Sequence, residues 1–411
     1  MIIITAQFSA EYIRRTLSYE VIMKIAVIGA GIAGITAAYY LAKNKHDVTI
    51  FEKEPYAAMK CSFANGGQLS VSNSDVWTTW ANIVKGMKWM LKSDAPLLIR
   101  PELDWKKAAW LFKFVQSTLR KDSDIRTAKI IKLGLQSRRL YNTISRTENI
   151  KFDYNKSGIL RFYKNQSYFD SAKELKQLYY DCGVDLEVKN SEECLQIEPR
   201  LYHVKDNIVG GLWCEEDAVG DIHKFCINLA SVLELRYNVK FVYNHKVKVL
   251  DELSDFDNIV IANGSDACEF MIDNLCVYPV KGYSVTINNG HGSPAVSLLD
   301  DESKIVCSRL GDKLRVAGTA ELTGHNQDIT RSRVTPLLKW VKANFPNMDT
   351  SDYSQWACLR PMTPDMMPIV KRSEFNTRVY YHCGHGHLGW TIAAATAQRL
   401  SEIIEYETRA I

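Results

Sequence analysis

The sequence lacks a long run of charge of one sign, has no internal repeat, and contains little proline or glycine for its length. Its 411 residues include 11 Pro and 22 Gly with no fixed period, which excludes collagen-like and mucin-like chains. Lys and Arg number 51 against 47 Asp and Glu, a formal net charge of +4. Because no basic run alternates with aromatic residues, we expect no nucleic-acid partner.

Cysteine is used in a way that argues against a disulfide-rich secreted protein. The ten cysteines are scattered singly, and no C-x-x-C pair occurs. Isolated thiols of this kind indicate a reducing compartment, so we expect a cytoplasmic protein. The composition, 46% hydrophobic and 24% charged, is that of a soluble globular chain, and the length favours two domains.

The first 22 residues precede a second methionine, Met23, where the pattern of a folded domain begins. Charged residues, Glu11 and Arg14 among them, interrupt any apolar core, which argues against a signal peptide. We therefore interpret residues 1–22 as an N-terminal extension outside the fold. An upstream start codon is the favoured origin of this extension, and a short amphipathic arm is the alternative.

An uncharged stretch, residues 25–42, is long enough to span a membrane, but its internal order indicates something else. Residues 24–28 have the pattern of a strand, G-A-G-I-A-G that of a turn, and the Ala-rich segment to Leu41 that of a helix. Residues 46–52 follow as a second strand that ends on an acid. Together these elements predict a βαβ unit.

The turn of this unit carries the G-x-G-x-x-G spacing of a dinucleotide-binding site. Gly29 permits a tight turn, Gly31 lets the backbone approach a pyrophosphate, and Gly34 lets the helix pack on the sheet. Free amides at the helix N-terminus face the phosphates, and Glu52 is placed to bind a ribose. The expected cofactor residues here are Ile28, Gly29, Ala30, Gly31, Ile32, Ala33, Gly34, Glu52 and Lys53.

The far end of the chain repeats the arrangement of strand, glycine-rich loop and helix. Residues 378–383 form an expected strand, G-H-G-H-L-G-W follows, and the helix begins near Trp390. The first βαβ unit alone leaves NAD and FAD open. A single fingerprint with this second loop favours FAD, and the expected contacts are Gly384, His385, Gly386, His387, Leu388, Gly389, Trp390 and Thr391.

Several motifs in order carry a family resemblance from Met23 nearly to the end. After the fingerprint come S-F-A-N-G-G-Q (62–68), K-W-M (88–90), A-P-L (95–97), Y-P-V-K-G-Y-S (278–284), L-R-P-M-T-P-D (359–365) and G-H-G-x-L-G-W (384–390). This series resembles the D-amino acid oxidase superfamily of flavoproteins, and within it the family of bacterial D-amino acid dehydrogenase small subunits.

The resemblance implies an α/β fold in which a Rossmann-like FAD-binding domain is joined to a discontinuous α+β substrate domain with a mixed sheet. The implied FAD domain is made of residues 23–75, 205–270 and 345–411, and the substrate domain of residues 76–204 and 271–344. Further implied cofactor residues are Ser62, Asn65, Gly66, Gly67, Gln68, Val247, Ala262 and Gly264.

The resemblance also implies the reaction and its residues. Arg360 is expected to bind the substrate carboxylate, with Tyr283 and His385 as further catalytic residues. The implied reaction is oxidative deamination of a D-amino acid such as D-alanine, with hydride transfer to FAD and electrons passed to a quinone. Two alternatives stay open: an oxygen-using oxidase of glycine or sarcosine, and a flavin-binding scaffold without catalysis.

One cysteine and a cluster of three histidines raise two further questions, covalent attachment of FAD and metal binding. Cys358 falls in C-x-x-x-x-T-P-D, the segment in which the related monomeric sarcosine oxidases attach FAD through the cysteine, so a thioether at Cys358 is the alternative to an ordinary buried thiol. His382, His385 and His387 have no further ligand pair nearby, so we expect no metal site.

The segment 77–121 is rich in aromatic and basic residues. It holds five of the nine tryptophans and nine basic against three acidic residues. Such a composition suits a peripheral contact with the inner face of the cytoplasmic membrane, where a quinone would be reached. The favoured alternative is a pair of helices that caps the active site.

Overall fold

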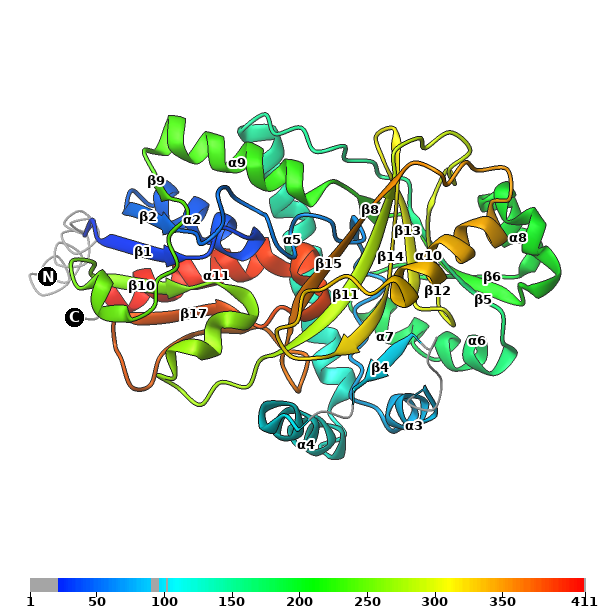
Figure 1. Cartoon of the computed structure of the whole chain (residues 1–411), viewed down its shortest axis with the longest axis horizontal. Coiled ribbons are helices and arrows are strands. Elements are labelled where there is room, and N and C mark those ends of the chain that lie inside the picture. Colours follow the sequence, from blue (N-terminus) through cyan, green and yellow to red (C-terminus); the bar gives the residue numbers. More distant parts are fainter. Residues whose placement is uncertain (1–20, 90–95, 101–102, 410–411) are drawn as a thin grey trace, which may run out of the picture.

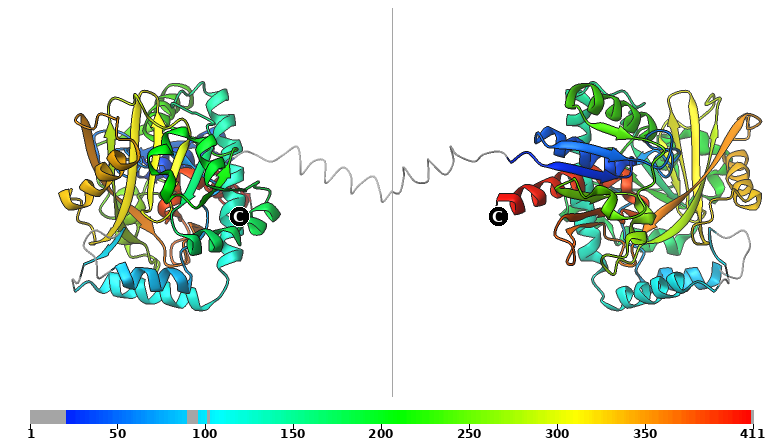
Figure 2. Two further views of the ribbon diagram at one scale, coloured as in Figure 1. Left: turned by 90° about the vertical axis from the view of Figure 1, so that its right-hand side faces the viewer. Right: turned by 60° about the vertical axis from the view of Figure 1, so that its left-hand side comes forward.

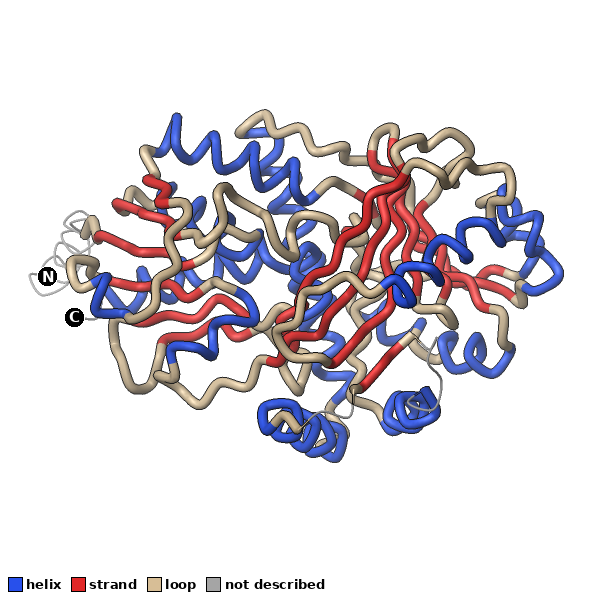
Figure 3. Tube along the Cα trace, viewed as in Figure 1, coloured by secondary structure: helices blue, strands red, loops and turns tan. Residues whose placement is uncertain are grey.

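The computed structural model describes residues 21–89, 96–100 and 103–409. They form two large sheets side by side with helices around them, and a further sheet of two short strands (Figure 1). Most of the predicted N-terminal extension lies outside the described residues. One large sheet contains strands from the N-terminal part of the chain, from residues 240–261 and from the C-terminal part, and the other contains strands that lie between residues 97 and 362 (Figures 1 and 3).

The first sheet has six strands in the order β16-β17-β10-β1-β2-β9. Five strands run parallel, and four of them, β1, β2, β10 and β17, have buried interiors, whereas the edge strand β9 is partly exposed. Only β16 runs antiparallel, against β17. The strands are β1 (Lys24–Ile28), β2 (Asp47–Phe51), β9 (Lys240–Val242), β10 (Asn258–Ile261), β16 (Ile369–Arg372) and β17 (Val379–Cys383).

Helices α2, α9, α11 and α5 pack with this sheet and with each other (Figure 1). Their bounds are α2 Ile32–Lys43, α5 Ser123–Thr147, α9 Ile222–Tyr237 and α11 Gly389–Arg409. Alanines such as Ala37 and Ala393 are fully buried where α2 and α11 meet the core. Small side chains allow this close helix packing, which brings the two glycine-rich turns of the sequence together.

The second sheet is mixed and follows the order β15-β11-β14-β13-β12-β5-β7-β6, with β4 paired to β14. Helix α10 (Arg331–Asn344) packs against β11 and β14. The strands are β4 (Leu97–Ile99), β5 (Ile159–Tyr163), β6 (Glu187–Lys189), β7 (Gly210–Cys214), β11 (Tyr278–Ile287), β12 (Ser297–Asp300), β13 (Ile305–Leu310), β14 (Lys313–Leu322) and β15 (Tyr353–Met362).

The remaining elements are short or lie at the edge of the molecule. Helices α3 and α4 lie along one edge, below the second sheet in Figure 1 and along the bottom of both views in Figure 2. These elements are α3 (Trp80–Trp89), α4 (Trp105–Leu119), α6 (Gln166–Lys173), α7 (Lys176–Asp181), α8 (Ser191–Ile197), β3 (Gln68–Leu69), β8 (Ala218–Val219), and the 3-10 turns η1 (Pro199–Asn207), η2 (Leu250–Leu253), η3 (Gly264–Phe270) and η4 (Gly386–Leu388).

The structure confirms the predicted strand, turn and helix at residues 24–43, so the uncharged stretch is no membrane span. Within the ranges given above, no helix is both long enough and apolar enough to cross a membrane. The domain division remains a prediction. Strands β7 and β15 fall in segments assigned to the cofactor domain, yet both pair in the second sheet.

Candidate active site

A cavity of about 1060 Å³ is lined by residues of both sheets and by the loops between them. The elements that line it are the turn after β1, the segment after β2, strands β11, β14 and β15, and the loop before α11. All the predicted site residues line this cavity except Ala30, Gly34 and Gly384. The sequence motifs therefore converge on one place.

The turn after β1 has the geometry that its glycines predicted. Gly29 has a φ of 103°, and a Cβ there would press on the backbone of Ala262 and Asn263. A Cβ at Gly34 would overlap with the carbonyl oxygen of Gly29, so only glycine lets α2 come this close to the turn. Helix α2 begins at Ile32, and its N-cap residue Gly31 has no side chain to bond the first amides. Its N-terminus thus offers backbone amides to an anion.

Glu52 lies at the end of β2 and closes the other side of this turn. Its Oε2 accepts a hydrogen bond from the Ala30 amide at 2.6 Å, and its Oε1 accepts one from the Glu54 amide at 3.0 Å. Burial raises the pKa of the carboxyl, although these two amide bonds oppose the shift. Glu52 therefore fixes the turn around the expected dinucleotide.

Two further observations fit a dinucleotide at this end of the cavity. The Oδ1 atom of Asn263, a residue that lines the cavity, is buried and has no hydrogen-bond partner among the described residues. Such a buried acceptor is costly unless a ligand or water bonds it. Ser62 accepts a hydrogen bond from the amide of Ile32 at 3.0 Å, which holds the segment after β2 against the first turn of α2.

Arg360 defines the second end of the cavity. On β15 it pairs with Val280 of β11, and its guanidinium lies over Gly282, where any side chain would overlap with it. Nη1 donates a long bond of 3.5 Å to the Thr319 carbonyl oxygen. No ion pair of Arg360 with an acidic residue is recorded in the described ranges. An unpaired guanidinium in a cavity is suited to bind a carboxylate bidentately.

A β-bulge brings Thr319 to this position. The register of β11 with β14 shifts between Gly282 and Tyr283, and Thr319 has a φ of 55° at the extra residue. The buried Oγ1 of Thr319 has no hydrogen-bond partner among the described residues. Thr319 thus lines the same cavity as Arg360, with a hydroxyl that bonds no described residue. The sequence gives no signal for this position of Thr319.

Tyr283 also lines the cavity, but its hydroxyl is engaged elsewhere. It donates a hydrogen bond of 2.6 Å to Oε2 of Glu321, and the ring belongs to the hydrophobic core between the second sheet and α10. Burial, followed by the bond to Glu321, raises the pKa of Tyr283 to about 12. The predicted contact of this hydroxyl with substrate remains a prediction.

The histidines of the C-terminal loop are held neutral. His385 Nε2 and His382 Nε2 lie 2.9 and 2.8 Å from Oγ1 of Thr396, and burial lowers the pKa of His385 to about 4. His387 stacks on Trp77 with ring centres 4.5 Å apart. Burial, and then the nearby charge of Arg360, lower the pKa of His387 to about 3. These rings line the cavity as uncharged groups.

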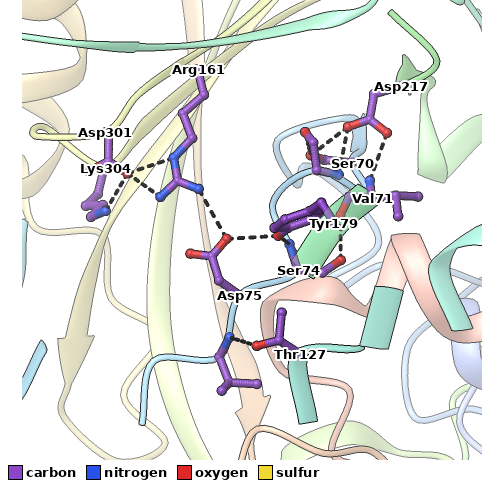
Figure 4. A network of polar contacts seen from close by, with 12 residues as sticks. Ser70, Val71, Ser74, Asp75, Thr127, Arg161, Tyr179, Asp217, Asp301 and Lys304 are labelled. Atoms are coloured by element: carbon purple, nitrogen blue, oxygen red, sulfur yellow. Dashed lines mark hydrogen bonds and ion pairs between the residues drawn. The ribbon is translucent and has the colours of Figure 1, made fainter. Parts of the chain in front are cut away.

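A chain of four charged residues forms the wall near Arg360 and His387, and sequence reasoning missed it (Figure 4). Arg161 donates from Nη1 to Asp75 at 3.1 Å and from Nη2 to Asp301 at 2.6 Å, and Lys304 donates to Asp301 at 2.9 Å. Burial opposes ionisation, but Arg161 and Lys304 outweigh it and lower the pKa of both carboxyls. All four residues line the cavity.

The other predicted cofactor residues are brought to the cavity by loops. Val247 lies in the loop after β9, and Lys53 forms an ion pair of 2.6 Å with Asp266. Asn65 accepts a hydrogen bond from the Gly67 amide, and Gln68 donates one to Ser297. No cluster of three metal-ligating side chains occurs in the part of the chain that the structure describes.

A family model described as FAD dependent oxidoreductase, DAO, matches residues 24–403. The chain belongs to this family. It is 40% identical to D-amino acid dehydrogenase 3 of Mesorhizobium japonicum, covering 93% of this chain and 97% of that protein. It is 35% identical to the D-amino acid dehydrogenase of Rhizobium johnstonii, covering 93% and 96%.

Solved structures of this DAO fold resemble the whole molecule. Glycine oxidase from Geobacillus kaustophilus has a TM-score of 0.72 at 17% identity, covering 93% of this chain and 95% of that one. L-alpha-glycerophosphate oxidase from Mycoplasma pneumoniae with FAD bound has a TM-score of 0.70 at 19% identity, with the same coverage. At these identities the likeness shows the fold alone. The family cofactor is FAD, and the turn after β1 fits it.

Proposed function

We propose that this protein is an FAD-dependent dehydrogenase of D-amino acids such as D-alanine, forming 2-oxo acids and ammonia and passing electrons to a quinone. The observation that carries the proposal is the unpaired Arg360 guanidinium in the same cavity as the dinucleotide turn. The names of the two relatives above support the substrate class.

Residues at one end of the cavity would bind the cofactor, and residues at the other end would bind the substrate. Gly31, Glu52 and Ser62 form the end that would hold the dinucleotide of FAD. Bound FAD supplies the hydride acceptor for the Cα–H bond. Arg360 binds the substrate carboxylate and so fixes which bond of the substrate faces the acceptor.

Little acid–base chemistry by the protein is needed. His385 and His387 are neutral near the cavity, so they add no positive charge to oppose an amine. The indole of Trp77 stacks on one face of the His387 ring. Arg360 therefore supplies the unpaired positive charge that faces the substrate carboxylate. The substrate amine has to lose its proton before oxidation.

The proposal is tested by turnover with a ubiquinone analogue in air. D-alanine should give equal amounts of pyruvate, ammonia and reduced quinone, with little hydrogen peroxide. L-alanine should give none. Turnover of glycine or sarcosine with stoichiometric peroxide would instead identify an oxygen-using oxidase and contradict the proposal.

The mode of FAD attachment is a separate prediction about Cys358. The thiol lines the cavity, which a thioether to the flavin requires. Acid precipitation of the holoenzyme separates the two outcomes. Yellow colour in the pellet supports the thioether, and yellow colour in the supernatant excludes it.

Contact with a membrane surface would bring the protein to its quinone. Helix α4 exposes Trp105 by 90% and Phe112 by 65%, and lysines 106 and 113 lie on the same helix. Apolar rings beside lysines suit an anionic interface. Flotation with anionic vesicles tests this contact, and protein that stays in the bottom fraction at low salt would contradict it. Trp110 and Phe114 of the same helix line the cavity, as the capping alternative expects.

A further inference from the structure

Two thiols from distant parts of the chain lie together in the wall of the cavity. Cys61 belongs to the segment after β2, and Cys358 lies on β15. The Cys61 Sγ donates a hydrogen bond of 2.8 Å to the carbonyl oxygen of Leu359, the residue next to Cys358, and the two thiols lie close enough for each to shift the pKa of the other. Both cysteines line the cavity and neither is fully exposed.

The backbone around this pair is fixed on both sides. The indole Nε1 of Trp356 donates to the carbonyl oxygen of Lys60 at 3.3 Å, and the Ser284 hydroxyl donates to that of Ala64 at 2.7 Å. These two bonds attach the segment that contains Cys61 to β15 and β11. The contact of Cys61 with Cys358 therefore follows from the docking of this segment on the second sheet.

The surroundings also favour thiol chemistry. Arg360 lies two residues after Cys358 on β15, so both side chains point to the same face of the strand. The neighbouring Cys61 side chain lowers the pKa of Cys358, the charge of Arg360 acts in the same direction, and burial opposes both. A thiol of lowered pKa next to a second thiol is an arrangement from which disulfides form.

We propose that Cys61 and Cys358 form a reversible disulfide that ties the cofactor-binding segment to the substrate strand. The oxidant in this reaction is a low-molecular-weight disulfide. The Cys358 thiolate attacks one sulfur of that disulfide, a mixed disulfide forms, and one small thiolate leaves. Cys61 then attacks the Cys358 sulfur, the Cys61–Cys358 bond forms, and the second small thiolate leaves. The pair loses two electrons, and its two protons go to the two released thiols.

The bond would hold the two ends of the cavity together. Cys61 precedes Ser62, which contacts the first turn of α2, while Cys358 is on the strand that carries Arg360. FAD bound between them should therefore leave the oxidised protein more slowly. The same Cys358 sulfur cannot form both this disulfide and a thioether to the flavin.

The test uses the holoenzyme, oxidised with oxidised glutathione, alkylated, digested without reduction and analysed by mass spectrometry. The expected product is one cross-linked peptide pair joining Cys61 to Cys358. Cys268 and Cys276 are the matched control, because Cys268 Sγ lies 3.7 and 3.8 Å from the carbonyl oxygens of Leu275 and Val277 on either side of Cys276. The control pair should remain alkylated, because burial raises the pKa of both Cys268 and Cys276 and so disfavours the reactive thiolate.

A second readout is the temperature at which the protein releases FAD, followed by the fluorescence of the freed FAD. Oxidation should raise it by about 3 °C or more in the wild type, since the bond links distant segments, and should not change it in Cys61→Ser. Full alkylation of both cysteines after oxidation would overturn the proposal, as would mixed disulfides without the cross-link or a flavin mass on the Cys358 peptide. None of these outcomes depends on the substrate, so they are separate from a failure of the proposed function.

Discussion

The guanidinium of Arg360 occupies the space that a side chain at position 282 of the neighbouring strand would fill. Gly282 on β11 has Cys358 opposite it on β15, and Arg360 extends back over the bare glycine. The absence of a side chain at Gly282 therefore determines where the Arg360 guanidinium, the group proposed to bind the substrate carboxylate, points. In this account Gly282 is a positioning residue, since it acts through Arg360.

Gly282→Ala should displace Arg360 without removing it. We expect KM for D-alanine to rise by roughly 10-fold or more, because the bidentate geometry is lost, while the absorbance of bound FAD is retained. Steady-state kinetics with a ubiquinone analogue measure this change. Gly86→Ala on α3 is the control, because its Cβ would meet only Leu97 at an ordinary 3.8 Å. Equal KM values for both variants would contradict the role of Gly282.

Substitution of Arg360 itself should affect substrate and not cofactor. Arg360→Met removes about 3 kcal/mol or more of carboxylate binding, roughly 10²-fold in kcat/KM. Arg360→Lys should restore only part of this loss, since an ammonium does not match two carboxylate oxygens. Kinetics of both variants, together with their FAD content, check the prediction. A wild-type kcat/KM in Arg360→Met would show that the carboxylate binds elsewhere.

The pH dependence of activity should show no inflection from titration of His385 or His387. His385 and His387 have pKa values of about 4 and about 3, lowered mainly by burial, so both stay neutral from pH 6 to 9. The profile of kcat/KM should therefore rise with pH as the substrate amine loses its proton. His387→Gln should give a parallel profile. A wild-type inflection near pH 6.5 that disappears in His387→Gln would contradict this assignment.

The charged wall should stabilise the fold in a pH-dependent way. The folded pKa values of Asp75 and Asp301 lie below their ordinary value of 3.8, so their contribution is present above that pH and is lost as pH falls through the folded values. Arg161→Leu leaves both carboxylates buried without this partner. We expect a loss of about 3–5 kcal/mol at pH 7 that becomes smaller near pH 4, where the freed carboxyls take up protons.

Thermal unfolding of wild type and Arg161→Leu at pH 7 and pH 4 measures this difference. Lys173→Ala is the control, because its partner Asp170 is exposed and such surface pairs contribute about 0–1 kcal/mol. A gap in Tm between wild type and Arg161→Leu that is the same at both pH values would contradict the pKa directions.

The parts of the site that sequence could predict depend on short local patterns. The turn at Gly29 to Gly34 and the loop before α11 each combine a strand, glycines and a helix within a few residues. Local spacing is enough to specify their backbone, and the structure confirms both elements. Arg360 was predicted to lie in the site because it belongs to a recognisable motif, and it lines the cavity.

The parts that sequence missed depend on how distant strands pair. The contact of Tyr283 with Glu321 follows from the register of β11 with β14, and the bulge at Thr319 belongs to the same pairing. Arg161 on β5 meets Asp75 only because the second sheet places β5 near the segment that follows β3. No pattern within a single element contains this information.

Anaerobic reduction of the bound flavin tests the central claim most directly. The visible absorbance of the oxidised flavin in the holoenzyme is followed after addition of D-alanine or L-alanine without any acceptor. We predict bleaching by D-alanine in the wild type, little bleaching by L-alanine, and a large rise in the D-alanine concentration needed for Arg360→Met. Absence of bleaching by any D-amino acid in an FAD-loaded protein would contradict the account.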